Sequence, residues 1–207
     1  MPSINFKTWT TQQIEDEFGL IRLQKCPILT DWLNSSVDLS KDDSLYLEGL
    51  RARLEMYADS WNEEELKLKF ISLLLDKVNY ERATYNGFAN RKLTFKHNGK
   101  TIAGVVDFMV ASGRYEPKKP YFCFHEYKKE KGSDNDPRGQ LLIAMLAAQQ
   151  INDDSQPVYG VYVLGRMWFF VVLHGKNYCV SNDFSATQST ELQQIFSVLK
   201  ALNQIII

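Results

Sequence analysis

The stretch YFCFHEYK, residues 121–128, decides the fold because it reads as a buried strand that ends in charged residues. Its aromatic residues are typical of a strand interior. Side chains alternate between the two faces of a strand, so Glu126 and Lys128 are predicted to point to the same face. A carboxylate and an ammonium group in this position form either a solvated ion pair or part of a reaction centre.

The segment TIAGVVDFMVA, residues 101–111, is predicted to be a second strand. It follows the dipeptide Asn98-Gly99, which is a strong hairpin signal because that turn needs positive φ angles. Asp107 interrupts the apolar run, and a buried carboxylate is costly without a partner. If the two strands are adjacent, Asp107 lies beside Glu126. Two facing carboxylates are tolerated when a hard cation such as Mg²⁺ lies between them.

Helices are predicted on both sides of these strands in the sequence. The segment NEEELKLKFISLLLDKVNY, residues 62–80, opens with the capping residue Asn62 and three glutamates, as a helix N-terminus prefers. The segment QLLIAMLAAQQI, residues 140–151, follows Asp136 as a cap and Pro137 at the first helical position. Further helices are predicted within 1–60 and at 190–204, and further strands at 91–97, 157–165 and 167–175.

This order predicts an α/β fold, with a mixed sheet flanked by helices and a helical N-terminal extension. Several strands are apolar on both faces, which is typical of a sheet covered on both sides. A length of 207 residues suits one sizeable core. We therefore expect a single domain over residues 1–207, with the extension at 1–61, the core at 62–165 and a C-terminal strand and helix at 166–207.

The composition excludes several classes of protein. No apolar run reaches the roughly 20 residues of a membrane helix, and the N-terminus has no apolar signal segment. The three cysteines, Cys26, Cys123 and Cys179, are odd in number and widely spaced, which argues against a disulfide framework. We expect no membrane partner and a cytoplasmic location.

Positive charge is concentrated in the middle of the chain. Residues 66–131 carry 14 basic and 6 acidic residues, whereas residues 1–65 carry 6 basic and 13 acidic ones. A localised basic face is what a phosphate-binding surface requires, although a solvated lysine-rich surface explains the numbers too. The residues that would track a phosphate backbone are Lys118, Lys119, Lys129, Lys131 and Arg138.

The chain resembles the PD-(D/E)XK nuclease superfamily, which includes restriction endonucleases, type I restriction subunits and RecB-like repair nucleases. Asp107 in GVVDFMV, and Glu126 and Lys128 in HEYKK, carry the resemblance, and Val106 stands where the family has proline. The match covers about residues 62–165 and implies a restriction-endonuclease-like α-β-β-β-α-β core. It also implies that Asp107 and Glu126 bind Mg²⁺, with Mn²⁺ as a substitute, and that Lys128 serves the attacking water.

The resemblance extends to two further elements. A glutamate on the first core helix often joins such sites, and Glu63 or Glu64 is the candidate here, for catalysis or for the metal. Gln140, at the start of the helix after the lysine strand, is similar to a glutamine of RecB-like members. The implied function is Mg²⁺-dependent hydrolysis of phosphodiester bonds in DNA. A double-strand cut would need a second active centre, which leaves a homodimer or a partner subunit open.

Each of these residues also has a plainer interpretation. Asp107 could be a strand-edge residue paired with a lysine, and Glu126 with Lys128 an exposed pair worth about 0–1 kcal/mol. Glu63 to Glu65 could simply complement the helix dipole. Gln140 could be a polar residue at a helix start, and His125 is expected to be structural because it faces away from Glu126. The competing functions are a non-catalytic nucleic-acid-binding or protein-interaction domain, and a structural α/β protein.

Overall fold

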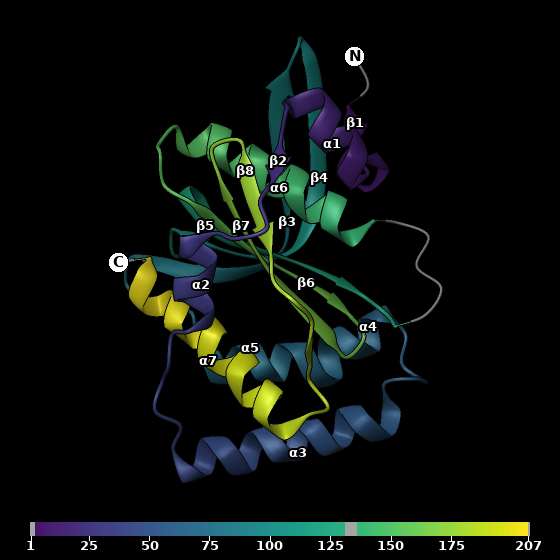
Figure 1. Ribbon diagram of the computed structural model, residues 1–207, viewed down its shortest axis with the longest axis vertical. Helices are drawn as coiled ribbons and strands as arrows, with labels where there is room; N and C mark the ends of the chain where they lie inside the picture. Colours follow the sequence, from purple (N-terminus) through teal and green to yellow (C-terminus); the bar gives the residue numbers. More distant parts are fainter. Residues whose placement is uncertain (1–2, 131–135, 207) are drawn as a thin grey trace.

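The computed structural model describes residues 3–130 and 136–206, and the strands within them form one mixed sheet (Figure 1). These strands are β1 (Ile4–Asn5), β2 (Ile21–Arg22), β3 (Tyr85–His97), β4 (Lys100–Ser112), β5 (Lys118–Lys128), β6 (Val158–Leu164), β7 (Met167–His174), β8 (Asn177–Val180) and β9 (Phe184–Ser185). Their order is β1-β4-β5-β6-β7-β8-β2, with β3 paired to β4 and β9 paired to β7. The β4–β5 pair is antiparallel and the β5–β6 pair is parallel.

Helices cover both faces of this sheet (Figure 1). They are α1 (Thr11–Phe18), α2 (Pro27–Leu33), α3 (Lys41–Tyr57), α4 (Glu63–Leu66), α5 (Ser72–Val78), α6 (Pro137–Asn152) and α7 (Ser189–Ile205). Helices α1 and α6 lie on one face, and α2, α3, α5 and α7 on the other. The predicted α/β class, a mixed sheet flanked by helices, is confirmed. Within the described residues, every helix is too short or too polar to span a membrane.

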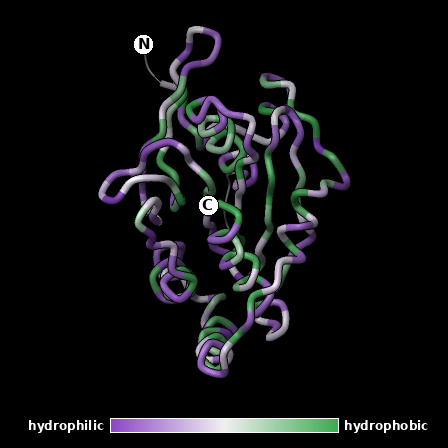
Figure 2. Tube along the Cα trace, turned by 90° about the vertical axis from the view of Figure 1, so that its left-hand side faces the viewer, coloured by the Kyte–Doolittle hydropathy of each residue, from purple (hydrophilic) through white to green (hydrophobic). Residues whose placement is uncertain are grey.

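Each face of the sheet has its own hydrophobic core. Phe124 and Met145 are fully buried in the core beneath α6, and Trp168 and Phe196 in the core beneath α7. In Figure 2 the hydrophobic stretches run along the central strands, and hydrophilic stretches dominate the outlying turns. Of the aromatic residues of β6 and β7, Tyr159, Tyr162, Trp168 and Phe170 are buried in these cores, and Phe169 is half-buried.

The hairpin before Asp107 forms where the sequence predicts it. Asn98 and Gly99 have φ angles of 48° and 74°, the positive values that the turn requires. The first strand of the hairpin begins at Tyr85, earlier than the segment 91–97 that the alternating pattern indicates. Pairing along β4 extends the strand into residues whose own pattern is weak.

The N-terminal extension contributes to the sheet as well as to the helices. Its short strand β1 pairs with β4, and β2 pairs with β8, both in parallel. The expectation of a purely helical segment was therefore incomplete. Two-residue strands carry no detectable alternation, and only their partners in the sheet define them.

The start of α6 is fixed to the N-terminal segment. Asp136 caps the helix by accepting a hydrogen bond from Gly139 N at 2.9 Å. Its other oxygen accepts bonds from Thr11 N at 2.7 Å and Thr11 Oγ1 at 2.6 Å. A Cβ on Gly139 would lie 2.6 Å from Trp9 O, so the close approach requires glycine. These contacts fix the start of α6 to the N-terminal segment, while its apolar residues share a core with Phe124 of β5.

Candidate functional site

Strand β4 begins to pair with β5 immediately after Asp107. The first register pair is Phe108 with His125, whereas the earlier residues Ile102 and Ala103 pair with β1. Asp107 directly precedes that first pair. Its Oδ2 accepts a hydrogen bond from Tyr127 N at 2.8 Å. This bond satisfies a backbone donor of β5 that has no backbone partner on β4. The predicted adjacency of the strands of Asp107 and Glu126 is confirmed.

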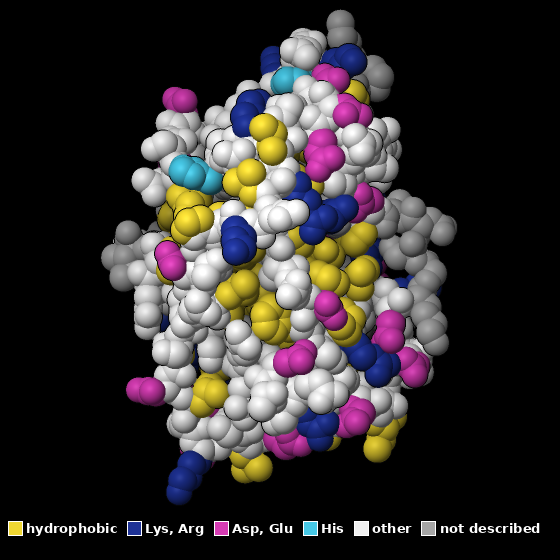
Figure 3. All heavy atoms as spheres, viewed as in Figure 1, with side chains coloured by type: hydrophobic (Ala, Val, Ile, Leu, Met, Phe, Trp, Pro, Cys, Tyr) yellow, Lys and Arg dark blue, Asp and Glu magenta, His cyan; other side chains and the backbone are white. Residues whose placement is uncertain are grey.

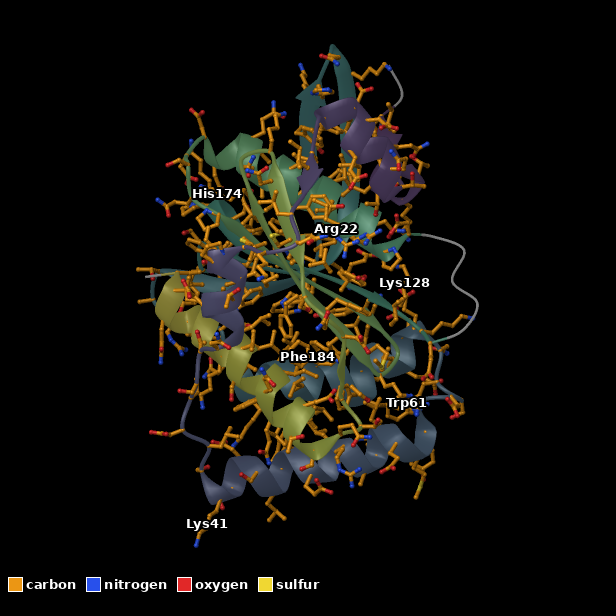
Figure 4. The ribbon with its side chains drawn as sticks, viewed as in Figure 1. Arg22, Lys41, Trp61, Lys128, His174 and Phe184 are labelled. Atoms are coloured by element: carbon orange, nitrogen blue, oxygen red, sulfur yellow. The ribbon has the colours of Figure 1, made fainter. Side chains whose placement is uncertain are left out.

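Glu126 and Lys128 form a buried ion pair at the end of β5. Lys128 Nζ lies 2.7 Å from Glu126 Oε1, and the exposed fractions of their side chains are only 7% and 8%. The prediction that both residues point to one face is confirmed, and the interpretation as an exposed pair is wrong. In Figure 4, Lys128 lies at mid-height on the right of the molecule, far from Lys41 at its lower end.

Glu63 is the glutamate of the first core helix that reaches this pair. Its Oε2 lies 3.6 Å from Lys128 Nζ, and its side chain is 34% exposed. The side chain of Glu64 is 82% exposed and contacts Lys67 at 3.3 Å. Glu65 forms a capping box with Asn62. Complementing the helix dipole therefore explains Glu64 and Glu65 sufficiently, but Glu63 also contacts the buried lysine.

Lys67 is a member of the site that the sequence interpretation missed. Its Nζ lies 2.9 Å from Asp107 Oδ1 and 2.7 Å from Glu63 Oε1. It begins a π-helical turn, Lys67–Ile71, inside a segment predicted to be regular α-helix. Turns of this kind are frequent at functional sites. The i, i+4 spacing from Glu63 was the available signal, although it is common on helix surfaces.

Together these residues form a chain of alternating charge. Asp107 contacts Lys67, Lys67 contacts Glu63, Glu63 contacts Lys128, and Lys128 contacts Glu126. Three carboxyl groups therefore share two ammonium groups, which leaves one net negative charge when all three are ionised. The residues come from a helix and two strands, so the tertiary structure assembles the cluster.

Burial and the neighbouring charges shift the titration of the cluster. Burial and the negative charge of Asp107 raise the pKa of Glu126 to about 7, although Lys128 opposes this shift. Burial alone would raise the pKa of Glu63, but its hydrogen bond to Lys67 and the charge of Lys128 outweigh burial and lower it. Burial also works against the charged form of Lys128, yet the carboxylates around it raise its pKa. Both lysines stay protonated at neutral pH.

Gln140 is buried in the first turn of α6, with an exposed fraction of 3%. Its Nε2 has no hydrogen-bond partner within the described residues, so the structure provides no bond from Gln140 to Lys128. A buried amide without a partner is uncommon in a folded protein and is often associated with a function. The predicted role of Gln140 remains a prediction.

His125 lies on the face of β5 opposite the charged pair. Its Nδ1 hydrogen-bonds with Tyr127 Oη at 2.7 Å, and its ring packs against Phe108. Burial lowers the pKa of His125 to about 3, so the ring is neutral. These contacts agree with the structural role expected from strand alternation.

The proposed phosphate-tracking residues are dispersed. Lys118, Lys119 and Lys129 are exposed, whereas Arg138 is half-buried and donates to Thr11 Oγ1 at 3.1 Å. Lys131 lies outside the described residues. On the face seen in Figure 3, Lys and Arg side chains are interspersed with Asp and Glu around a hydrophobic area. Binding of DNA remains a prediction.

A pocket of about 530 Å³ opens beside the cluster. Lys67, Asp107, Glu64 and Asp76 contribute to its wall. Tyr80, Phe108 and Tyr127 supply aromatic surface. The pocket therefore joins the charged cluster to a mostly apolar cavity between the π-helical segment and β4.

The carboxylates suit a hard cation in number and chemistry. Mg²⁺ usually takes one or two protein carboxylates and completes its shell with water and phosphate oxygens. Asp107 and Glu126 could supply two, and without a cation, burial and the negative charge of Asp107 disfavour the ionised form of Glu126. Within the described residues, no group of three or more His, Cys, Asp or Glu side chains is arranged to hold a metal ion. The residues therefore fit a two-carboxylate site but not a complete protein cage.

Comparisons with models of protein families and with curated proteins found no match for this chain. Its function must therefore be inferred from the residues of the cluster and their geometry.

Proposed function

We propose that this protein is a divalent-cation-dependent nuclease that hydrolyses phosphodiester bonds in DNA through a site resembling that of PD-(D/E)XK enzymes. The observation that carries the proposal is the connected cluster of Glu63, Asp107, Glu126 and Lys128, in which Glu126 and Lys128 are buried and Lys67 lies between two of the carboxylates. Burying a charge costs free energy, and carboxylates with a shifted pKa in a cleft are common at functional sites.

Asp107 and Glu126 would hold Mg²⁺ or Mn²⁺, and Glu63 would assist through a water molecule. The bound ion would polarise the phosphoryl group and neutralise negative charge that develops on its oxygens. The fit rests on carboxylate oxygens, the ligands that Mg²⁺ prefers, held in place by protein contacts. Asp107 is fixed by Tyr127 N at 2.8 Å, and Glu126 by Lys128 at 2.7 Å.

Lys128 would act as a fixed cation and not as a general base. The surrounding carboxylates raise its pKa, so its ammonium group keeps its proton at neutral pH. A charged donor in a site sheltered from water can orient the attacking water and stabilise negative charge that develops on the phosphate. Gln140 would position Lys128 or the substrate, as the resemblance implies.

One observation favours a second candidate function. Lys67 already pairs with Asp107 and Glu63, so the cluster is partly neutralised without any metal. A domain that keeps the fold and binds nucleic acid or another protein without catalysis would have the same ion pairs. The two functions differ in whether the carboxylates are needed for cleavage.

Incubation of the purified protein with linear, circular and single-stranded DNA, and with RNA, tests the proposal. We expect DNA cleavage with Mg²⁺ or Mn²⁺ and none with EDTA. Lys128→Ala and Asp107→Ala should abolish it, while Lys41→Ala, at an exposed residue far from Lys128, should not.

The outcomes separate the candidates. Cleavage of RNA alone would replace the substrate class. DNA binding that weakens with salt, survives Asp107→Ala and is never followed by cleavage would favour the non-catalytic domain. The three free cysteines of the described residues agree with a reducing cytoplasm, which we propose as the location.

A further inference from the structure

Lys67 has no role in the proposed chemistry, yet it makes more contacts with the carboxylates than any of the predicted residues. Its ammonium group lies within 2.7 Å of Glu63, 2.9 Å of Asp107 and 3.3 Å of Glu64. Its side chain is only 19% exposed. It is thus a half-buried cation in contact with two carboxylates of the cluster.

The position of this ammonium group conflicts with that of a divalent ion. Lys67 occupies Asp107 Oδ1, while the other carboxylate oxygen, Oδ2, already accepts a hydrogen bond from Tyr127 N. A magnesium ion binds carboxylate oxygens at about 2.1 Å, so both cations would share the same oxygens and repel each other. With its three carboxyl groups ionised, the cluster has one net negative charge when Lys67 is in place and two without it.

The surroundings give the Lys67 side chain another place to go. The pocket of about 530 Å³ is lined by Lys67 itself and by the carboxylates of Glu64 and Asp76. Glu64 is exposed and already within 3.3 Å of the ammonium group. A lysine side chain has four flexible carbons and a strongly hydrated charge, so it can turn toward the pocket without moving the helix.

We propose that Lys67 is a built-in counter-cation that competes with the divalent metal for Asp107, while its contact with Glu63 holds it in place. It stabilises the carboxylate cluster when metal is absent and must turn away when metal binds. The affinity of the site for Mg²⁺ or Mn²⁺ is therefore weakened by Lys67, and the site fills only when the metal concentration is high enough. This inference rests on the proposed function and concerns the regulation of the same site.

Calorimetric titration of the protein with MnCl₂ tests the competition directly. Lys67→Met removes the charge and keeps most of the side-chain volume. Lys69→Met is the matched control, because Lys69 lies on the same helix and pairs with Glu65 at 2.6 Å by the same i, i+4 spacing. We expect Lys67→Met to bind Mn²⁺ roughly tenfold or more tightly than the wild type, since a unit charge beside the ligand oxygens is removed. Lys69→Met should bind as the wild type does.

Thermal unfolding provides a second readout that does not depend on activity. In EDTA, Lys67→Met should melt at a lower temperature than the wild type, because Glu63 and Asp107 lose their shared counter-cation. Addition of Mg²⁺ should raise the melting temperature more for Lys67→Met than for the wild type. If Lys67→Met does not fold, Lys67→Gln, which keeps a hydrogen-bond donor without the charge, has the same expected results.

The results distinguish this inference from the proposed function. If the wild type binds Mn²⁺ and the Lys67 variants bind it equally or more weakly, the counter-cation role of Lys67 is overturned and the nuclease proposal stands. Absence of Mn²⁺ binding by the wild type and by every variant would overturn both. Binding by the Lys67 variants alone would support the counter-cation and show that the wild-type site is closed to metal.

Discussion

Lys128 and Glu126 form an ion pair at 2.7 Å, and both side chains are more than nine-tenths buried. Removing two charges from water costs several kcal/mol per ion, and only close geometry with further partners offsets this cost. Glu63 at 3.6 Å supplies one such partner for Lys128. The pair is therefore a sensitive point of the fold as well as the centre of the candidate site.

Breaking this pair should destabilise the protein strongly. Lys128→Met leaves Glu126 buried without its cation, and we expect a loss of about 3–5 kcal/mol in the free energy of unfolding. Urea denaturation measures it. Lys129→Met, at the exposed neighbouring residue, is the control and should stay within about 0.5 kcal/mol of the wild type.

Removing both charges should restore much of the stability. The double variant Lys128→Met/Glu126→Gln has no buried unpaired charge, so its loss should be smaller than the sum of the two single losses. A double-mutant cycle gives the coupling energy between the two positions. Additive losses would show that the two charges do not interact.

The elevated pKa of Glu126 predicts a pH dependence of stability in metal-free protein. Its pKa of about 7 lies above the ordinary value of 4.5, because burial and the charge of Asp107 disfavour the carboxylate. Between pH 4.5 and about 7, Glu126 therefore keeps its proton in the folded state and releases it in the unfolded state. The stability that protonated Glu126 contributes falls as the pH rises through this range. It is present below the unfolded pKa and lost above the folded one.

Glu126→Gln removes this titration and serves as the reference. Between pH 4.5 and 7 the wild type should lose about 3 kcal/mol relative to the variant, measured by chemical denaturation in EDTA. A difference that does not change with pH would show that Glu126 is charged throughout the range.

His125 predicts the opposite dependence at lower pH. Burial lowers its pKa from 6.5 to about 3, so the folded state keeps the ring neutral while the unfolded state protonates. Its contribution to stability is full above pH 6.5 and is lost as the pH falls toward 3. We expect His125→Phe to have a flatter acid profile than the wild type, and His174→Gln, at an exposed position, to keep the wild-type profile.

Gly139 should not tolerate a side chain. The Cβ of Gly139→Ala would lie 2.6 Å from Trp9 O and 2.9 Å from Thr11 N, and backbone atoms give way poorly. We expect a loss of about 1–3 kcal/mol in unfolding free energy. Gly49→Ala is the matched control, since Gly49 lies within α3 with nothing within 4 Å of its Cβ, and alanine there should stabilise by about 0.5–1 kcal/mol. Equal effects of the two substitutions would contradict the close packing of α6 on the N-terminal segment.

Local patterns were sufficient for the main elements of the fold. The Asn98-Gly99 turn, the cap at Asp136 and the alternation along residues 121–128 each depend on neighbours in sequence, and all three are confirmed. The parallel pairing of β5 with β6 follows from the helix between them. The strands β1 and β2 were missed because two residues cannot establish a period.

The sequence by itself determined that a buried strand would end in Glu126 and Lys128 on one face, beside an adjacent strand with Asp107. Only the tertiary structure decided that Glu63 reaches Lys128 while Glu64 points to solvent, and that Lys67 contacts Asp107 from 40 residues away. Periodicity fixes which side of an element a residue occupies. Which charges share a buried space depends on how a helix crosses the sheet and on the π-helical turn that directs Lys67 toward β4.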